Sequence, residues 1–167
     1  MRWMKSVFGA GKAAARNAQR DPPAASRVDA LVRAGYDRES ESDVAGAERF
    51  YRQAVELDPA HAEAHYFLAR IAAWDRRFGE AISLCQTATE SNPGEATYLF
   101  ELGNALRAAG RFEESLEVFR ACLALLPESV PVRINLAVDL IELDRREEAR
   151  IDLERLRDLM QIGRAHV

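Results

Sequence analysis

The sequence predicts an all-α fold, in which about four antiparallel helix pairs stack into a solenoid. Three observations predict it: prolines recur at a fixed interval, small side chains recur in the same register, and apolar residues follow helical spacing. The prolines are Pro59, Pro93 and Pro127, which stand 34 residues apart. A repeat of this length is typical of solenoids, because one hairpin cannot bury both of its faces and must stack on its neighbours.

Small residues recur at three positions of the repeat. Aligning the chain on the prolines gives four windows: 28–61, 62–95, 96–129 and 130–161. The eighth, twentieth and twenty-seventh positions are mostly small, as in the third window, which has Gly103, Ser115 and Cys122. Antiparallel helices come within about 8–10 Å of each other only where small side chains meet, so we expect the paired helices to cross there. Bulkier residues at the seventh, seventeenth and twenty-fourth positions are predicted to fill the space between hairpins.

Helical spacing predicts where each helix lies. In the third window, Leu116, Phe119, Leu123 and Leu126 recur every three to four residues. We expect the first helices of the four pairs near 28–40, 62–75, 96–109 and 130–143. We expect the second helices near 43–57, 79–91, 112–125 and 146–159.

Glycine and proline supply the turn signals. Gly110 follows the first helix of the third pair, and a glycine just past a helix is a common stop. Asn92 and Asp58 each precede a proline. They are therefore predicted to cap the next helix, with Pro93 and Pro59 at its first position.

The pattern resembles the tetratricopeptide repeat family. The residues that carry the resemblance are Leu102-Gly103-Asn104-Ala105-Leu106, Gly110-Arg111-Phe112, Ser115, Phe119 and Pro127. The resemblance covers 28–160 and implies a right-handed α-solenoid. The first window departs from the family pattern at Arg38, where an aromatic residue is usual, and the fourth departs at Arg146 and Leu156.

The resemblance also implies that the first helices line a concave groove that binds a peptide or protein segment. Its predicted lining residues are Tyr36, Tyr66, Arg70, Trp74, Phe100, Asn104, Arg107 and Asn135. Exposed aromatic residues beside arginines are typical of peptide recognition, and the two asparagine amides can pair with a peptide backbone. Phe67, Ile134 and Val138 fall on the same helix faces, and for these three packing between hairpins is an equal alternative.

No residue set predicts catalysis, a metal site or a cofactor. His61 and His65 stand four residues apart, a spacing that can bind a metal, but without a third ligand we interpret them as helix-surface residues. Cys85 and Cys122 fall inside apolar helical runs and are interpreted as inert core thiols. We therefore expect a non-enzymatic scaffold with a protein or peptide partner and no cofactor.

Charge divides the chain into a basic arm and an acidic body. Residues 1–27 carry six basic side chains and one acidic one, whereas 28–161 carry 16 basic and 26 acidic ones, so the net charges are +5 and −10. An acidic body repels phosphate, and we expect no nucleic-acid partner for it. The two cysteines are too few for a disulfide framework, and no apolar run approaches the roughly 20 residues of a membrane span. The expected location is the cytoplasm.

The basic arm leaves two interpretations open. Trp3, Met4, Val7 and Phe8 fall on one helical face, and 1–20 contains no acidic side chain. This composition is similar to that of a transit peptide or a membrane-surface helix, which would allow membrane contact. We favour the alternative, in which the apolar face packs on the first repeat.

The last six residues, 162–167, resemble the translation of a sequencing adapter. We interpret them as an artefact, outside the fold, and expect the natural gene to continue beyond residue 161. A longer gene leaves a second function open, in which these repeats form the N-terminal arm of a larger enzyme of the glycosyltransferase or sulfotransferase type.

Overall fold

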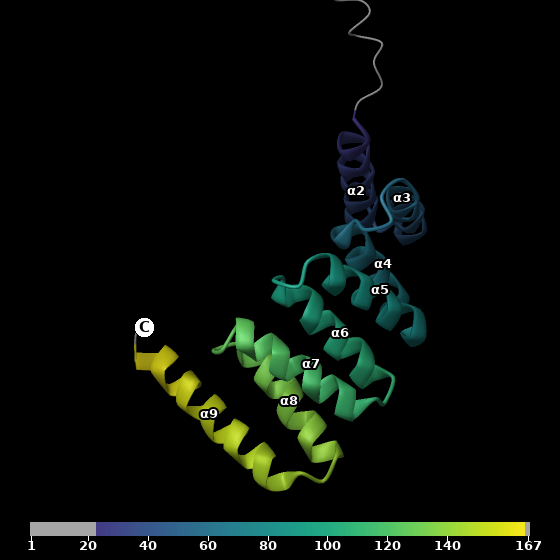
Figure 1. The fold of residues 1–167 in the computed structure, drawn as a ribbon. Helices are drawn as coiled ribbons and strands as arrows, with labels where there is room; N and C mark the ends of the chain where they lie inside the picture. The colour runs from purple at the N-terminus through teal and green to yellow at the C-terminus, as the bar shows by residue number, and fades with distance from the viewer. Residues whose placement is uncertain (1–22, 166–167) are drawn as a thin grey trace, which may run out of the picture.

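The computed structural model describes residues 23–165, and every regular element within them is an α-helix (Figure 1). The helices form four hairpins: α2 (Ala24–Ser40) with α3 (Val44–Leu57), α4 (Ala62–Trp74) with α5 (Phe78–Ser91), α6 (Ala96–Ala108) with α7 (Phe112–Leu125), and α8 (Val130–Glu142) with α9 (Arg146–Ala165). The predicted all-α solenoid is confirmed. The expected helix ranges agree to within a few residues, except that α2 begins before residue 28 and α9 continues past residue 159. Residues 1–22 of the basic arm, on which its two interpretations rest, lie outside the described residues, whereas residues 24–27 belong to α2.

The first helices of the hairpins form the inner layer of the stack. α4 contacts α6 and α6 contacts α8, whereas no comparable contact joins the second helices of neighbouring hairpins within the described residues. Each second helix packs instead on the next first helix, α3 on α4, α5 on α6 and α7 on α8. Because α4, α6 and α8 lie closer together than the second helices do, the stack follows a curve (Figure 1) with these first helices on its inner side. A bond from Arg70 of α4 to Glu39 joins α2 to the same layer.

The hydrophobic core lies between hairpins as well as within them. One buried cluster combines Val28 of α2, Tyr51 of α3 and Leu68 of α4. A second joins α4, α5 and α6, and a third joins α6 and α7 to α8 and α9. Since each cluster draws on neighbouring hairpins, stacking completes the core. Between residues 23 and 165, no helix combines the length and apolar character needed to cross a membrane.

The paired helices meet where the sequence places its small residues. A methyl group added to Gly103 would lie only 2.8 Å from Cδ1 of the buried Phe119 ring. Gly35 stands in the same relation to Tyr51, with 2.7 Å to Cδ1. Opposite Gly103, the fully buried Ser115 hydroxyl donates to the Gly103 carbonyl at 2.9 Å. The prediction that small side chains mark the helix crossings is therefore confirmed.

The turns inside the hairpins repeat one backbone feature with the period of the prolines. Ser42, Arg76, Gly110 and Asp144 all have positive φ, at 67°, 61°, 75° and 55°, and they stand 34 residues apart. Glycine adopts this conformation readily and other residues do so at a cost. The predicted stop at Gly110 is confirmed, and three non-glycine residues take the same role.

The predicted helix caps at the prolines are wrong. Asn92 and Asp58 lie one position past the ends of α5 and α3, where they are the C-terminal caps, and they do not cap the following helices. Pro93 and Pro59 lie in the turns between hairpins, and the next helices begin three residues after each proline. In their place, the imidazole of His61 caps α4 and the carboxylate of Glu95 caps α6.

We predict that Gly103→Ala destabilises the fold. The added methyl group meets the Phe119 ring, which is fully buried and cannot move aside, and overpacking of this kind costs about 1–3 kcal/mol. The matched control is Gly79→Ala in α5, where nothing lies within 4 Å of the added methyl group. Chemical denaturation of both variants checks this, and equal stabilities would contradict the packing argument.

We predict that Ser42→Gly stabilises the fold and that Gly110→Ala destabilises it, each by about 1 kcal/mol. Both residues have positive φ in equivalent turns, and an added methyl group at Gly110 meets nothing within 4 Å. The difference is therefore conformational and not steric. Thermal unfolding of the two variants tests it; shifts of the same sign would show that the backbone conformation is not the cause.

Candidate functional site

Two hollows are lined by the first helices: one by residues of α2 and α4 alone, the other by residues of α2, α4 and α6 together with the start of α3. The Trp74 hollow has a volume of about 410 Å³ and is lined by Glu39, Val44, Arg70, Ile71, Ala73, Trp74 and Glu101. The Tyr36 hollow has a volume of about 280 Å³ and is lined by Asp29, Val32, Arg33, Tyr36, Glu63 and Phe67. Because α4 contributes to both, the two hollows form neighbouring parts of one groove.

Each hollow has a large aromatic side chain that faces solvent. Trp74 is 86% exposed, and Tyr36 is 59% exposed. The Tyr36 ring lies beside the buried Phe67 ring, with ring centroids 6.4 Å apart. Tryptophan is highly buried on average in folded proteins, so an almost fully exposed indole at the rim of a hollow indicates a surface that another molecule can cover.

Arg70 is held in place by contacts on both sides. Its Nη2 donates to Glu39 Oε1 at 3.1 Å, and the Tyr51 hydroxyl donates to Glu39 Oε2 at 3.1 Å. The guanidinium carbon lies 5.8 Å from the ring centroids of Tyr66 and Phe67, which is within cation–π range. Burial and the Glu39 carboxylate raise the pKa of Tyr51, which keeps its hydroxyl a donor. The Arg70–Glu39 pair thus joins α4 to α2.

Asn104 and Asn135 are brought together across α6 and α8. The Asn135 Nδ2 donates to Asn104 Oδ1 at 2.7 Å. Glu101 lies one turn before Asn104 and is partly buried. Burial raises the pKa of the Glu101 carboxyl, and the Arg70 guanidinium and the Asn104 amide offset part of the rise. The amide pair keeps an oxygen on Asn135 and an N–H on each residue for a peptide backbone.

Phe100 and Arg107 belong to the hairpin packing more than to the hollows. Phe100 is partly buried against the third core cluster, 6.1 Å from the Phe119 ring centroid. The Arg107 Nε lies 4.0 Å from a carboxylate oxygen of Asp139, which is fully buried. Neither residue lines the two hollows, and their role in binding stays a prediction. Of the three residues with two open interpretations, Phe67 is buried in the core, Val138 is partly buried and Ile134 is 44% exposed.

Sequence reasoning missed three residues of this region. Glu39 and Val44 line the Trp74 hollow, and Asp139 lies 4.0 Å from Arg107 between the third and fourth hairpins. Glu39 occupies the same position of its window as Arg107 does in the third, so the repeat register could have found it. Val44 comes from the second helix and Asp139 from a packing position, and no signal in the sequence marks them.

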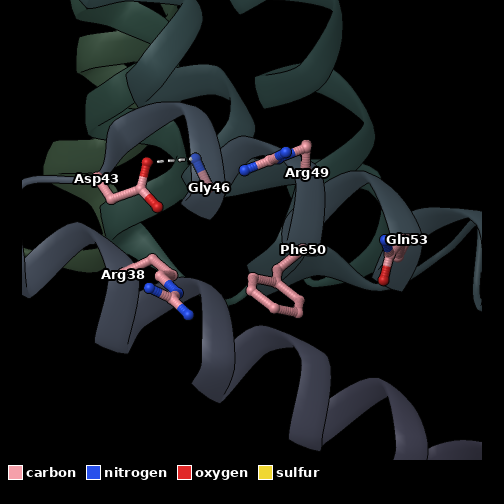
Figure 2. Close-up of a pocket in the computed structure, with 6 residues that line it drawn as sticks. All are labelled: Arg38, Asp43, Gly46, Arg49, Phe50 and Gln53. Carbon is pink, nitrogen blue, oxygen red and sulfur yellow. Dashed lines mark hydrogen bonds between the residues drawn. The ribbon is translucent and has the colours of Figure 1, made fainter.

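A separate hollow of about 350 Å³ lies on the first hairpin, between α2 and the start of α3 (Figure 2). It is lined by Arg38, Asp43, Gly46, Arg49, Phe50 and Gln53. The Asp43 carboxylate accepts from the Gly46 N–H at 2.9 Å and caps α3, so it is committed to the fold. The remaining charged lining is cationic, unlike that of the concave hollows.

Comparison with protein families identifies the repeat. A family model described as tetratricopeptide repeat matches residues 40–102 and 106–161, and a second of the same description matches 75–130. The chain belongs to the tetratricopeptide repeat family. The resemblance inferred from the small residues and prolines is therefore confirmed, and the family and fold are those of a protein-interaction scaffold.

Two relatives are similar to the tetratricopeptide repeats of this chain. The peroxisomal targeting signal receptor of Kluyveromyces lactis is 29% identical over 101 residues, which are 60% of this chain and 18% of the relative. Tetratricopeptide repeat protein 1 of Schizosaccharomyces pombe is 29% identical over 100 residues, 60% of this chain and 10% of the relative. The matches thus span less than a fifth of either relative.

Solved structures share the tetratricopeptide solenoid. A crystal structure of MamA has a TM-score of 0.78 at 19% identity, covering 83% of this chain and 81% of MamA. MamA from Desulfovibrio magneticus RS-1 has a TM-score of 0.74 at 18% identity, covering 80% and 76%. An O-GlcNAc transferase mutant from Thermobaculum terrenum has a TM-score of 0.65 at 27% identity, covering 72% of this chain and 23% of the transferase chain. These likenesses support the same stack of hairpins.

The histidines and cysteines have structural roles in the tetratricopeptide array. His61 Nδ1 accepts from a backbone N–H in the first turn of α4, and the buried His65 Nε2 lies 2.9 Å from the Pro59 carbonyl, to which it donates. Cys85 and Cys122 are buried free thiols, and burial raises the pKa of Cys85 to about 12. Over residues 23–165, no group of three or more His, Cys, Asp or Glu is placed to hold a metal ion.

Asp139 is a fully buried carboxyl at the interface of the third and fourth hairpins. Neither of its oxygens accepts a hydrogen bond from the described residues. Burial raises its pKa, and Arg107 opposes the rise. Ser115 also lies close enough to lower the pKa, but its one proton is donated to the Gly103 carbonyl, so we assign it the smaller effect. The charged form of Asp139 therefore destabilises the fold.

We predict that Asp139→Asn raises the stability at neutral pH and that this advantage disappears in acid. A carboxyl whose pKa is raised in the folded state destabilises the fold above that pKa, and the penalty is relieved as the pH falls toward the ordinary value of about 3.9. Denaturation of the variant and the parent at pH 7 and pH 4 measures the difference. An advantage that grows in acid would contradict the assigned pKa direction.

Proposed function

We propose that residues 28–161 form a protein-interaction scaffold that binds an extended peptide segment of a partner protein along the concave groove. The observation that carries the proposal is the indole of Trp74, which is exposed in a hollow lined by α2, α3, α4 and α6. Buried tryptophans are the residues most often responsible for binding energy at protein interfaces. A partner side chain in this hollow would cover the indole.

The rest of the groove supports an extended ligand. The Tyr36 hollow offers a second site for a side chain along the same helix, α4. The Asn104–Asn135 pair keeps donors and an acceptor with which to pair a peptide backbone. Arg70, which lines the Trp74 hollow, is held by Glu39 and lies beside two aromatic rings. The groove is thus largely formed before binding, which reduces the entropy lost on association.

The proposed scaffold performs no chemistry within residues 28–161. The proposal that this array forms the arm of a larger enzyme, the second function considered, has one supporting observation. The O-GlcNAc transferase mutant is similar to this chain over 23% of the transferase chain. Recovery of the uninterrupted reading frame tests it: a catalytic domain after residue 161 supports the enzyme arm, and a stop codon soon after it rules the arm out.

We predict that Trp74→Ala weakens peptide binding by about 30-fold, which corresponds to about 2 kcal/mol for an interface hot spot. Peptides are first selected on the full chain from a random dodecapeptide phage library, and the Kd of each selected peptide is then measured by fluorescence anisotropy.

The control is Ile151→Ala on α9, which removes an apolar side chain that is also exposed, by 55%, from outside the groove. It should leave the Kd unchanged. Selected peptides that bind the Trp74→Ala variant as tightly as the parent would refute binding in the groove.

A further inference from the structure

We propose that the partner segment presents a lysine or arginine side chain next to a large apolar side chain, the cation at Glu101 and the apolar group against Trp74. The proposal rests on the proposed function and names the chemistry of its ligand. Glu101 and Trp74 line the same hollow, so one short segment can reach both.

The charge of the groove favours a cation. The linings of the two concave hollows contain four carboxylates and two guanidiniums, a net charge of −2. The charged residues are Asp29, Arg33, Glu39, Glu63, Arg70 and Glu101. An acidic segment would be repelled by most of them, whereas a basic segment gains from the same field.

Arg70, the one basic residue that lines the Trp74 hollow, already pairs with a carboxylate of the protein. Arg70 donates to Glu39 at 3.1 Å, and Glu39 also accepts from the Tyr51 hydroxyl. The Arg70 guanidinium also lies beside two aromatic rings. Arg70 is therefore poorly placed to leave Glu39 for a carboxylate of a ligand. Among the described residues, Glu101 forms no ion pair within 4.0 Å, so it is the carboxylate of this hollow that a ligand cation can pair with.

The surroundings of Glu101 strengthen the preference. Its carboxyl is partly buried, and burial destabilises the charged form. A cation brought by a ligand would compensate that charge in a partly desolvated site, where ion pairs are stronger than at an open surface. The Trp74 indole adds attraction on the same side, because its face binds both apolar groups and cations.

The hollow on the first hairpin shows what a site for an acidic ligand would look like here. Its charged side chains other than the helix-capping Asp43 are Arg38 and Arg49, beside Phe50 (Figure 2). The two regions therefore have opposite charge, and the concave one suits a basic segment.

The test begins with the peptides selected on the full chain from the random dodecapeptide library. They should be enriched in lysine or arginine next to Trp, Phe, Leu or Met. Glu101→Gln should weaken the best synthetic peptide about tenfold. Glu113→Gln, which removes the same charge from an exposed position on α7, should leave its Kd unchanged.

A double-mutant cycle identifies the pair. Replacing the basic residue of the peptide with norleucine should weaken binding to the parent chain about tenfold and change binding to the Glu101→Gln variant little. Equal losses against both proteins would overturn the proposal, because the cation would then bind elsewhere.

Two further outcomes separate this inference from the proposed function. If the selected peptides are neutral or acidic but their binding still depends on Trp74, the proposal of a basic ligand is refuted and the proposal of binding in the groove is supported. If the Kd of the selected peptides depends on neither Trp74 nor Glu101, both the proposal of binding in the groove and the proposal of a basic ligand are refuted.

Discussion

The close approach of the two helices in each hairpin is the constraint on which the structure depends. Where they cross, Gly103 faces the Phe119 ring with no room for a methyl group, and Gly35 faces Tyr51 in the same way. The ring of the second helix fills the space that the glycine leaves, so the two helices form one compact unit. Its apolar faces remain open, and each is covered only by the neighbouring unit. Stacking, curvature and the concave groove all follow from this contact.

Stacking also determines which side chains are available for recognition. In each first helix, some residues pack against the second helix or the neighbouring hairpin, and those on the concave side are free to differ between repeats. The first hairpin shows this freedom. Glu39 links the Tyr51 hydroxyl to Arg70 of the next hairpin, so part of the contact between these units is polar. The same bonds fix Arg70 in the groove, and hairpin stacking and groove formation are coupled there.

The sequence predicts the helices well because their signals are local and repeated. Small residues at the crossings and the glycine stop at residue 110 placed most helix ends within a few residues. The turns were harder. Ser42, Arg76 and Asp144 have positive φ, as Gly110 does. Only the glycine indicates this conformation in the sequence. The predicted N-terminal caps are wrong because an Asn or Asp before a proline is also compatible with the end of a helix. Asn92 and Asp58 each lie one residue past the end of a helix.

The groove was predictable only in part, for a physical reason. Helical periodicity assigns residues to a face, and three of the residues that it assigns to the groove, Tyr36, Arg70 and Trp74, line the two hollows. It cannot say which side chains of one face bond to each other, because that depends on rotamers and on distances between helices. Arg107, assigned to the groove, lies 4.0 Å from the buried carboxylate of Asp139, a contact that helical periodicity does not reveal.

Two carboxyls with raised pKa values, Glu101 and Asp139, show how burial alone fails to identify a binding residue. Burial destabilises the charged form of both. Asp139 is fully buried between hairpins, so no ligand can reach it and its charge only reduces stability. Glu101 lines a hollow beside the exposed Trp74, so a ligand cation can compensate its charge. Desolvation of the carboxylate therefore only lowers stability at Asp139, whereas at Glu101 it strengthens the pairing with a ligand cation. The difference is that a ligand can reach Glu101 and cannot reach Asp139.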